Sequence, residues 1–240
     1  MDKKIIAFIQ SRMGSSRLPG KALLPIMGVP LILRVVERVE CVNGLDDIVV
    51  LISNDRADDI LAERLEQEGK KYFRGDLENV QKRFYDAMLV YQPDVIMRVT
   101  GDNPLIEPIL MQRMVEVWQR EKVDYVACAE CILGVGAELF TKEAFHRAIV
   151  LSSTAYCKEH VTPAFYQNEA QFSIMRVGVE EYLADRTISL TVDNEDHYQR
   201  IVALYERFYR DGYISNKSVV AFLRQEMRTQ HDDNMIEKLM

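Results

Sequence analysis

The chain has 240 residues, 48% of them hydrophobic, and a formal net charge of −7 at pH 7. This length and apolar content suffice for one large or two small domains with a buried core, and the acidic balance argues against a broad nucleic-acid-binding surface. No apolar run approaches the roughly 18 residues of a membrane span, and no secretory h-region follows the first lysines. We therefore expect a cytoplasmic protein without a membrane or nucleic-acid partner.

The first β-rich run, residues 5–9, ends in a loop that carries glycines, hydroxyl groups and cations. Such a change marks the carboxyl end of a strand, where ligands bind in open α/β sheets. Gly14 and Gly20 let the backbone approach a ligand closely, and cationic donors come from Arg12, Arg17 and Lys21. A nucleoside triphosphate carries roughly four negative charges, which these cations and one divalent metal would balance. From the residues alone, a polyphosphate site and a solvated basic turn both fit this loop.

Two common phosphate motifs are excluded. A P-loop has four residues between its first glycine and the Gly-Lys pair and then Ser or Thr, whereas five residues separate Gly14 from Gly20 and Ala22 follows the lysine. A dinucleotide fingerprint follows the first strand, but the Gly134-x-Gly136 pair comes late and lacks the third glycine.

Strand and helix patterns alternate through the first half of the chain. Strands are predicted at 5–9, 48–52, 72–73, 95–100 and 125–128, and helices at 30–42, 56–68, 76–91 and 107–121. This alternation predicts a doubly wound α/β sheet. Asp102 follows the strand 95–100 after a turn at Gly101, so it reaches the same sheet edge as the first loop. It fits either a metal ligand or a turn residue.

The cysteines raise a metal question. Cys128-x-x-Cys131 and Cys157-x-x-His160 together have the ligand types and spacing of a structural zinc site. The run 124–128 also predicts a strand, in which cysteine is a common small core residue, so the zinc site stays an open alternative. A disulfide is not expected in a chain without an export signal.

The pattern changes from about residue 133. A largely helical stretch is predicted at 142–168, strands at 172–177 and 188–192, and helices at 195–210 and 216–227. No Pro, Gly or Ser-rich linker divides the chain. Asp193 repeats the position of Asp102, because it ends a β-rich run just before a helix, and the same two interpretations apply.

A family resemblance favours the nucleotide interpretation. The stretch FIQSRMGSSRLPGK is similar to the signature A-R-x-x-S-x-R-L-P-x-K, with Ser11 in the place of the alanine. Further similar segments follow in order: IMGVPLI, VVLISND, FRGDLENV, RVTGDNPLI, EHVTP and LTVDNEDHY. The chain thus resembles the cytidylyltransferase family that makes CMP-activated acidic sugars, and within it the spore-coat polysaccharide branch.

The resemblance implies a Rossmann-like, GT-A-like mixed sheet with a small inserted lobe. We expect one nucleotidyltransferase domain over 1–240, with a nucleotide-binding core at about 1–130, an acceptor and dimer lobe at 131–187, and a return strand with C-terminal helices at 188–240. A homodimer is also implied.

The resemblance also assigns site residues. It implies catalytic roles for Arg12, Arg17, Lys21 and Asp102, and Mg²⁺ ligation by Asp102 and Asp193. It implies nucleotide binding by Ser11, Arg12, Gly14, Ser15, Arg17, Lys21, Arg74 and Gly101, and acceptor binding by Glu138, Glu159 and His160. Arg83 matches a further basic position of the family. Considered without the resemblance, it is expected to be an exposed arginine on a helix. The chain departs from the family at Asn79, where Asp is usual, and in a short loop at 134–138, so the acceptor is left open.

The implied reaction transfers CMP from CTP to an acidic sugar, with release of pyrophosphate, in surface polysaccharide synthesis. One alternative is a nucleotidyltransferase that uses GTP or UTP on a phosphorylated acceptor. Another is a glycosyltransferase, which would normally carry a D-x-D motif, and Gly101-Asp102-Asn103 is not one. A regulatory nucleotide-binding module should have lost Asp102 or Asp193, and both are present.

Overall fold

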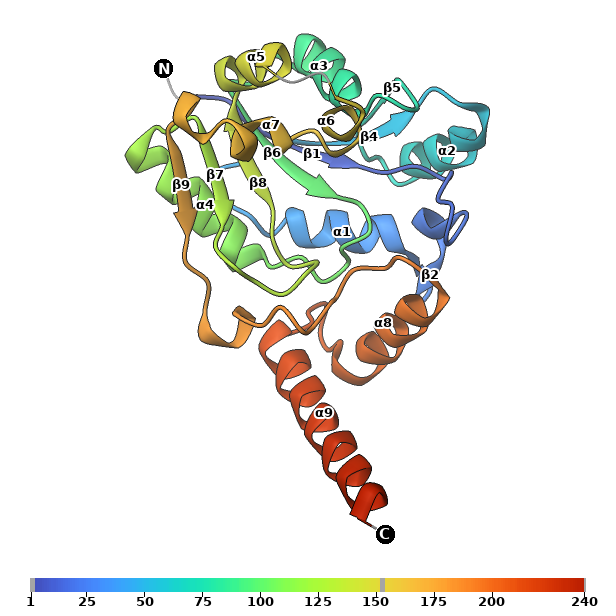
Figure 1. The fold of residues 1–240 in the computed structure, drawn as a ribbon. Coiled ribbons are helices and arrows are strands. Elements are labelled where there is room, and N and C mark those ends of the chain that lie inside the picture. Colours follow the sequence, from blue (N-terminus) through green and yellow to red (C-terminus); the bar gives the residue numbers. More distant parts are fainter. Residues whose placement is uncertain (1–2, 152–153, 240) are drawn as a thin grey trace.

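A seven-stranded sheet lies at the centre of the computed structural model, which describes residues 3–151 and 154–239 (Figure 1). The strands lie in the order β5-β4-β1-β6-β8-β7-β9. Neighbours are parallel except at β8, which is antiparallel to both β6 and β7. The bounds are β1 Ile5–Gln10, β4 Asp47–Ser53, β5 Tyr72–Gly75, β6 Val95–Thr100, β7 Tyr125–Cys128, β8 Glu138–Thr141 and β9 Ile174–Val177. The expected mixed α/β sheet is confirmed.

Both faces of the sheet are covered by helices, which explains the continuous apolar strands. Along β1, Ile5, Ala7 and Ile9 join the core cluster on one face, while Ile6 and Phe8 join the cluster on the other. In a strand that is buried on both faces, apolar residues do not alternate with polar ones, because successive side chains all point into a core. The central strands were predictable for this reason.

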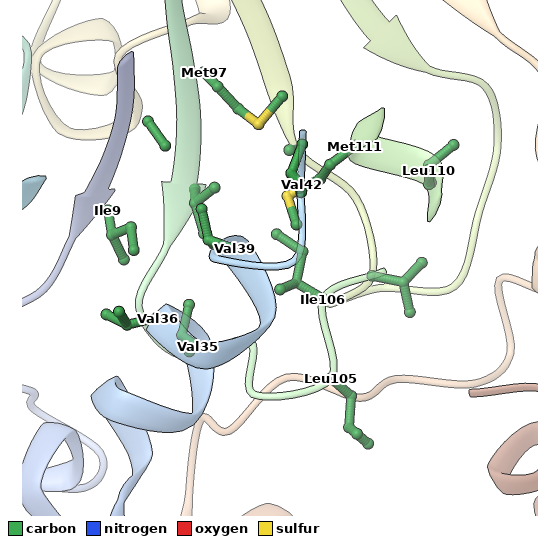
Figure 2. Packing of buried hydrophobic residues seen from close by; sticks show 14 of the residues in the cluster. Ile9, Val35, Val36, Val39, Val42, Met97, Leu105, Ile106, Leu110 and Met111 are labelled. Carbon is green, nitrogen blue, oxygen red and sulfur yellow. The ribbon is translucent and has the colours of Figure 1, made fainter. Parts of the chain in front are cut away.

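Two sets of helices form these layers. The first core cluster includes residues of α1 Leu31–Val39, α2 Asp59–Gln67, α4 Pro108–Glu121, α8 Glu195–Phe208 and the start of α9 Asn216–Leu239. The second includes residues of α3 Val80–Tyr91, α5 Lys142–Leu151 and α7 Pro163–Gln167, and α6 Ala155–His160 lies beside α3. Figure 2 shows Val35, Val36 and Val39 of α1 in the first cluster with Ile9 and Met111. α9 runs away from the sheet (Figure 1).

Short elements complete the chain. The strands β2 Pro25–Ile26 and β3 Val29–Pro30 form a small antiparallel hairpin. Single-turn 3₁₀ helices occur at η1 Lys21–Leu23, η2 Arg56–Asp58, η3 Glu169–Gln171 and η4 Glu181–Leu183. No helix of the described residues is both long and apolar enough to cross a membrane.

Several predicted elements were wrong in detail. Residues 188–192 are not a strand of the sheet: they form one isolated bridge, from Ser189 to Leu133, and their backbone bonds to loops. The helix predicted over 142–168 is divided into α5, α6 and α7, and residues 152–153 lie outside the described part. β8 and the β2/β3 hairpin were not predicted.

The helix ends that differ most from the prediction are the start of α3 and the end of α9. α3 begins at Val80 and not at 76, because the Asn79 side chain caps it by accepting a hydrogen bond from the Lys82 backbone N–H at 2.9 Å. Asn79 therefore supplies the oxygen that caps this helix. α9 extends to Leu239, well beyond the predicted end at 227.

The inserted segment 131–187 is part of the central sheet, since it contributes β8 and β9. Its helices α5, α6 and α7 lie over the second core face. The division into core, lobe and return segment stays a prediction.

Candidate active site

A polar pocket of about 360 Å³ opens at the carboxyl ends of β1 and β6. It contains most of the predicted site residues: Ser11, Arg12, Ser15, Arg17, Lys21, Gly101, Asp102, Glu159, His160 and Asp193. It is also lined by residues that were not predicted: Gln10, Ser16, Ala22, Val80, Arg98 and Thr100. Segments far apart in sequence thus meet at the sheet edge where α/β folds bind ligands.

The loop after β1 is held by its own backbone and by a buried aspartate. Gly20 N–H donates to the Met13 carbonyl at 2.9 Å, and Gly20 has the left-handed φ of 75° that this close return requires. The Asp58 carboxylate accepts hydrogen bonds from Met13 N–H at 2.7 Å and from both the N–H and hydroxyl of Ser53. Asp58 is 1% exposed and anchors the loop to the end of β4. Its role was not predicted, because nothing in the sequence separates it from an ordinary helix-start aspartate.

The two predicted metal ligands lie on either side of one lysine. Lys21 Nζ is 2.9 Å from Asp102 Oδ2 and 3.9 Å from Asp193 Oδ1, and it donates to the Val192 carbonyl at 2.7 Å. Arg17 forms an ion pair with Asp193 at 2.8 Å. Lys21 and Arg17 of the loop are therefore paired with these two carboxylates.

Backbone contacts fix both aspartates. Gly101 N–H donates to the Gln10 carbonyl at 2.8 Å, and a Cβ at Gly101 would lie 2.7 Å from that oxygen, so only glycine fits. Val192 N–H donates to the Asp102 carbonyl at 2.9 Å, which brings the segment before Asp193 alongside Asp102.

Magnesium suits this donor set. The ion is usually held by one or two carboxylates with phosphate oxygens and waters in the other positions. Asp102 and Asp193 provide two carboxylates within reach of one ammonium group. Among residues 3–151 and 154–239, no cluster of three or more His, Cys, Asp or Glu side chains forms a complete protein cage. The pair thus fits an ion that shares its coordination with a nucleotide.

Arg83 lines the pocket, and it is not the exposed helical arginine that is expected without the family resemblance. It is 1% exposed and donates to the carbonyls of Asp76 and Leu77, at 2.7–3.0 Å. Burial lowers its pKa to about 10. Arg12 donates to the same Leu77 carbonyl at 3.4 Å, so Arg83 helps to hold residues 76–77 beside the loop after β1.

Three predicted residues do not line the pocket: Gly14, Arg74 and Glu138. Arg74 is directed elsewhere, because it donates to the carbonyls of Ser53 and Asp55 and pairs with Asp59 at 2.6 Å. Glu138 lies behind Arg98, with which it forms an ion pair.

The cysteines and His160 do not form a zinc site in the described part of the chain. Cys128 Sγ contacts Met114 Sδ and the Ala137 carbonyl at 3.7 Å, as a core side chain does. Cys157 Sγ lies 3.7 Å from Gln167 Oε1, and His160 lines the pocket. The surroundings of Cys128 therefore agree with its interpretation as a small core residue of a strand.

Comparison with known proteins finds similarity along nearly the whole chain. The cytidylyltransferase family profile matches residues 6–226. The uncharacterized protein MJ1063 of Methanocaldococcus jannaschii is 36% identical over 205 residues, covering 85% of this chain and 84% of that protein. The spore coat polysaccharide biosynthesis protein SpsF of Bacillus subtilis is 29% identical and covers 92% of this chain and 94% of its own length. The solved structure of a cytidylyltransferase from Leptospira borgpetersenii is 25% identical, with a TM-score of 0.85 and coverage of 95% and 96%.

Proposed function

Because this chain belongs to the cytidylyltransferase family, we propose that it transfers CMP from CTP to an acidic sugar, with release of pyrophosphate. The observation that carries the proposal is the meeting of the loop cations with Asp102 and Asp193 in one pocket. The similarity to a spore coat polysaccharide protein supports a role in surface polysaccharide synthesis.

The loop residues bind and orient the triphosphate. Arg12, Arg17 and Lys21 line the pocket and would hold the β- and γ-phosphates, which stabilises the pyrophosphate as it leaves. Ser11 and Ser15 add hydroxyl donors on the same wall. Such a transfer depends on positioning and charge neutralisation more than on covalent participation by the protein.

Asp102 and Asp193 would hold Mg²⁺ together with oxygens of the nucleotide. When bound, the ion would polarise the α-phosphate. Lys21 and Arg17, which pair with these aspartates here, would then turn to the phosphates. His160 lines the same pocket and could serve as the base that takes a proton from the attacking hydroxyl of the acceptor.

The test is pyrophosphate release from each of the four nucleoside triphosphates, with magnesium, in the presence of sugar acids and phosphorylated sugars. We expect release from CTP with a sugar acid, and loss of the reaction in chelator. Preference for GTP or UTP with a phosphorylated acceptor would instead support the alternative nucleotidyltransferase. Transfer from a nucleotide sugar without pyrophosphate release would support a glycosyltransferase.

Nucleotide preference can be measured without the acceptor. Calorimetric titration should show that CTP binds more tightly than ATP, and only with a divalent cation. Equal affinities, or binding unaffected by chelator, would leave a generic nucleotide site.

We also propose a cytoplasmic homodimer. Exposed apolar side chains occur on α3, at Leu89 and Val90, and at the end of α5, at Val150 and Leu151. These helices are neighbours, since Tyr85 of α3 packs against His146 of α5 with ring centroids 5.3 Å apart. Sedimentation equilibrium should show that the wild type is a dimer and that Val90→Glu dissociates more readily. A monomeric wild type would contradict the proposal.

A further inference from the structure

A polar cluster interrupts one otherwise apolar face of the sheet at the base of the pocket. Arg98 of β6 is the direct partner of Glu138 in the β6/β8 register, and Gln10 lies at the end of the neighbouring β1. The same face is lined by apolar side chains further along these strands, including Ile96 and Phe140. Charged groups are rarely placed on a covered sheet face without a partner or a ligand, so this cluster requires an explanation.

Arg98 is fixed on one side and open on the other. Its Nε donates to Gln10 Oε1 at 3.0 Å, and its Nη1 pairs with Glu138. The side chain is 13% exposed and lines the pocket. Within the described part of the chain, Nη2 donates to no protein acceptor, although a guanidinium has five N–H groups. The unused donors are therefore available to a ligand in the pocket.

Glu138 orients Arg98 and does not line the pocket. Its carboxylate accepts hydrogen bonds from the Tyr125 hydroxyl and, at 2.9 Å, from the Thr162 hydroxyl, in addition to the pair with Arg98. Burial, together with the negative charge of Glu138, raises the pKa of Tyr125 well above its ordinary value, so this hydroxyl stays protonated and donates. A carboxylate with three donors holds the guanidinium plane in one orientation.

A strained turn completes the cluster. Val161 has φ 69° and ψ −53°, and Thr162 N–H donates to the His160 carbonyl at 2.8 Å, which together define a γ-turn of the rare, strained kind. A β-branched residue at positive φ is an outlier that persists only where its surroundings enforce it. This turn places His160 in the pocket and Thr162 on Glu138.

We propose that Arg98 binds the carboxylate of the sugar acceptor and that Glu138 is a positioning residue for Arg98. This inference rests on the proposed function, and it replaces the predicted direct contact between Glu138 and the acceptor. A planar guanidinium matches the two oxygens of a carboxylate. Arg98 is already paired with one carboxylate, so it suits a monoanion better than the dianion of a sugar phosphate, and the loop cations are reserved for the triphosphate.

The test measures binding and does not need turnover. Enzyme saturated with CMP is titrated by calorimetry with 3-deoxy-manno-octulosonate, N-acetylneuraminate, glucuronate and galacturonate, each beside its methyl ester. We expect wild type to bind at least one acid about 10- to 100-fold more tightly than its ester. Arg98→Gln should lose this preference while it binds CTP as wild type does. The matched control is Arg176→Gln, an exposed arginine of β9 that pairs with Glu169 outside the pocket.

Each result decides the question. Equal binding of acid and ester, no binding of any acid to wild type, preferential binding of sugar phosphates, or an unchanged Arg98→Gln would overturn the proposal. If Arg98→Gln fails to fold because Glu138 is left unpaired, the double variant Arg98→Gln/Glu138→Gln removes both charges and should fold without acid preference. Failure of the proposed function is seen separately, as no pyrophosphate release from CTP.

The positioning role of Glu138 has its own readout. For an acid that is turned over, Glu138→Gln should raise KM about tenfold and leave kcat and the KM for CTP nearly unchanged, and Glu138→Asp should restore part of the loss. A uniform fall in kcat with unchanged KM would show that Glu138 does not act through Arg98.

Discussion

At the scale of single residues, the two aspartates of the pocket pair with cations of the loop after β1. Lys21 bridges Asp102 and Asp193, and Arg17 pairs with Asp193. A triphosphate that entered with a divalent ion, as we propose, would exchange these partners for new ones. Free nucleotide alone would take the cations and leave two neighbouring carboxylates without counterions, which explains why we expect binding to require the metal.

The first prediction separates chemistry from stability at Asp102. Asp102→Asn keeps the side-chain volume and removes one charge, so turnover with CTP should fall by about 10²–10³-fold, the usual effect of losing one electrostatic stabiliser of the transition state. The melting temperature should change by less than about 4 °C. Paired melts and pyrophosphate-release rates test this, with Asp59→Asn as the control because Asp59 is exposed and pairs with Arg74. A lower melting temperature with normal turnover would make Asp102 a turn residue only.

The second prediction concerns the phosphate loop. Arg17→Ala should weaken CTP binding by about 1.5–3 kcal/mol, the range for a hydrogen bond to a charged group, and should leave CMP binding nearly unchanged. Calorimetry with both nucleotides measures the difference, and Arg120→Ala is the control because that side chain is 70% exposed and pairs with its neighbour Glu121. A parallel loss of CMP and CTP affinity would place Arg17 at the base or sugar.

At the scale of elements, the segment that carries Asp193 depends on a close backbone contact. Gly134 has φ 96°, and a Cβ there would lie 2.7 Å from Thr191 N and 2.8 Å from Leu190 C. Gly134→Ala should therefore destabilise the protein by about 2–4 kcal/mol in denaturant unfolding and weaken CTP binding, because residues 188–193 must move. Gly178→Ala should stay within about 0.5 kcal/mol, since its Cβ would meet nothing within 4 Å. Equal stability of the two variants would contradict the argument.

In the turn between α6 and α7, we expect a glycine variant to be more stable than an alanine variant. Val161 is fully buried, so Val161→Ala and Val161→Gly both lose the packing of the two γ-methyl groups, and glycine loses only the β-carbon in addition. Glycine adopts positive φ without strain, and Val161→Gly should therefore be more stable than Val161→Ala by about 0.5–1 kcal/mol, the reverse of the usual order. Urea unfolding of the two variants measures this difference. If alanine is the more stable, the γ-turn stores no strain.

Elements also explain what the sequence could predict. The bounds of β6 and β7 are those expected, because each begins directly after an aspartate and is rich in apolar residues. β8 was missed because it has four residues and begins with Glu138, whose partner is supplied by another strand. Residues 188–192 have the alternation of a strand, and Leu190 and Val192 belong to the first core cluster, but their backbone N–H groups donate to loop residues and not to a neighbouring strand.

In the site too, some positions follow from local sequence patterns and others depend on contacts between distant residues. The meeting of the loop after β1 with Asp102 was predictable, because residues at the carboxyl ends of parallel strands gather at one edge of the sheet. The place of Arg98 depends on the register of β6 with β1 and β8, and that of Asp58 on its bond to Met13, 45 positions away. Local patterns do not encode such pairings.

At the scale of the whole molecule, three aspartates join distant parts of the chain, and each has a lowered pKa. For Asp94 the main cause is the hydrogen bond from the Lys4 backbone N–H, and for Asp185 it is the hydrogen bond from the Thr187 hydroxyl, with Arg224 of α9 adding to it. Burial alone would raise the pKa of Asp124, but hydrogen bonds from Ser173 and Arg147 hold it below 3.8. These contacts tie the N-terminus to β6, the start of β7 to the segment before β9, and η4 to α9.

The last prediction follows from the sign of these shifts. A carboxyl group with a lower pKa in the folded state binds a proton first in the unfolded state, so its stabilising contribution is present above about pH 4 and is lost as pH falls through the folded value. Wild type should therefore lose stability steeply below pH 4. In Asp124→Asn and in Asp94→Asn, stability should be lower at pH 7 and should fall less between pH 5 and pH 2, because one titrating contact is gone. Urea unfolding across this range measures the slope, with the exposed Asp59→Asn as the control. Slopes equal to wild type in both variants would show that the acid sensitivity comes from other carboxylates, and that these ties do not hold the chain together.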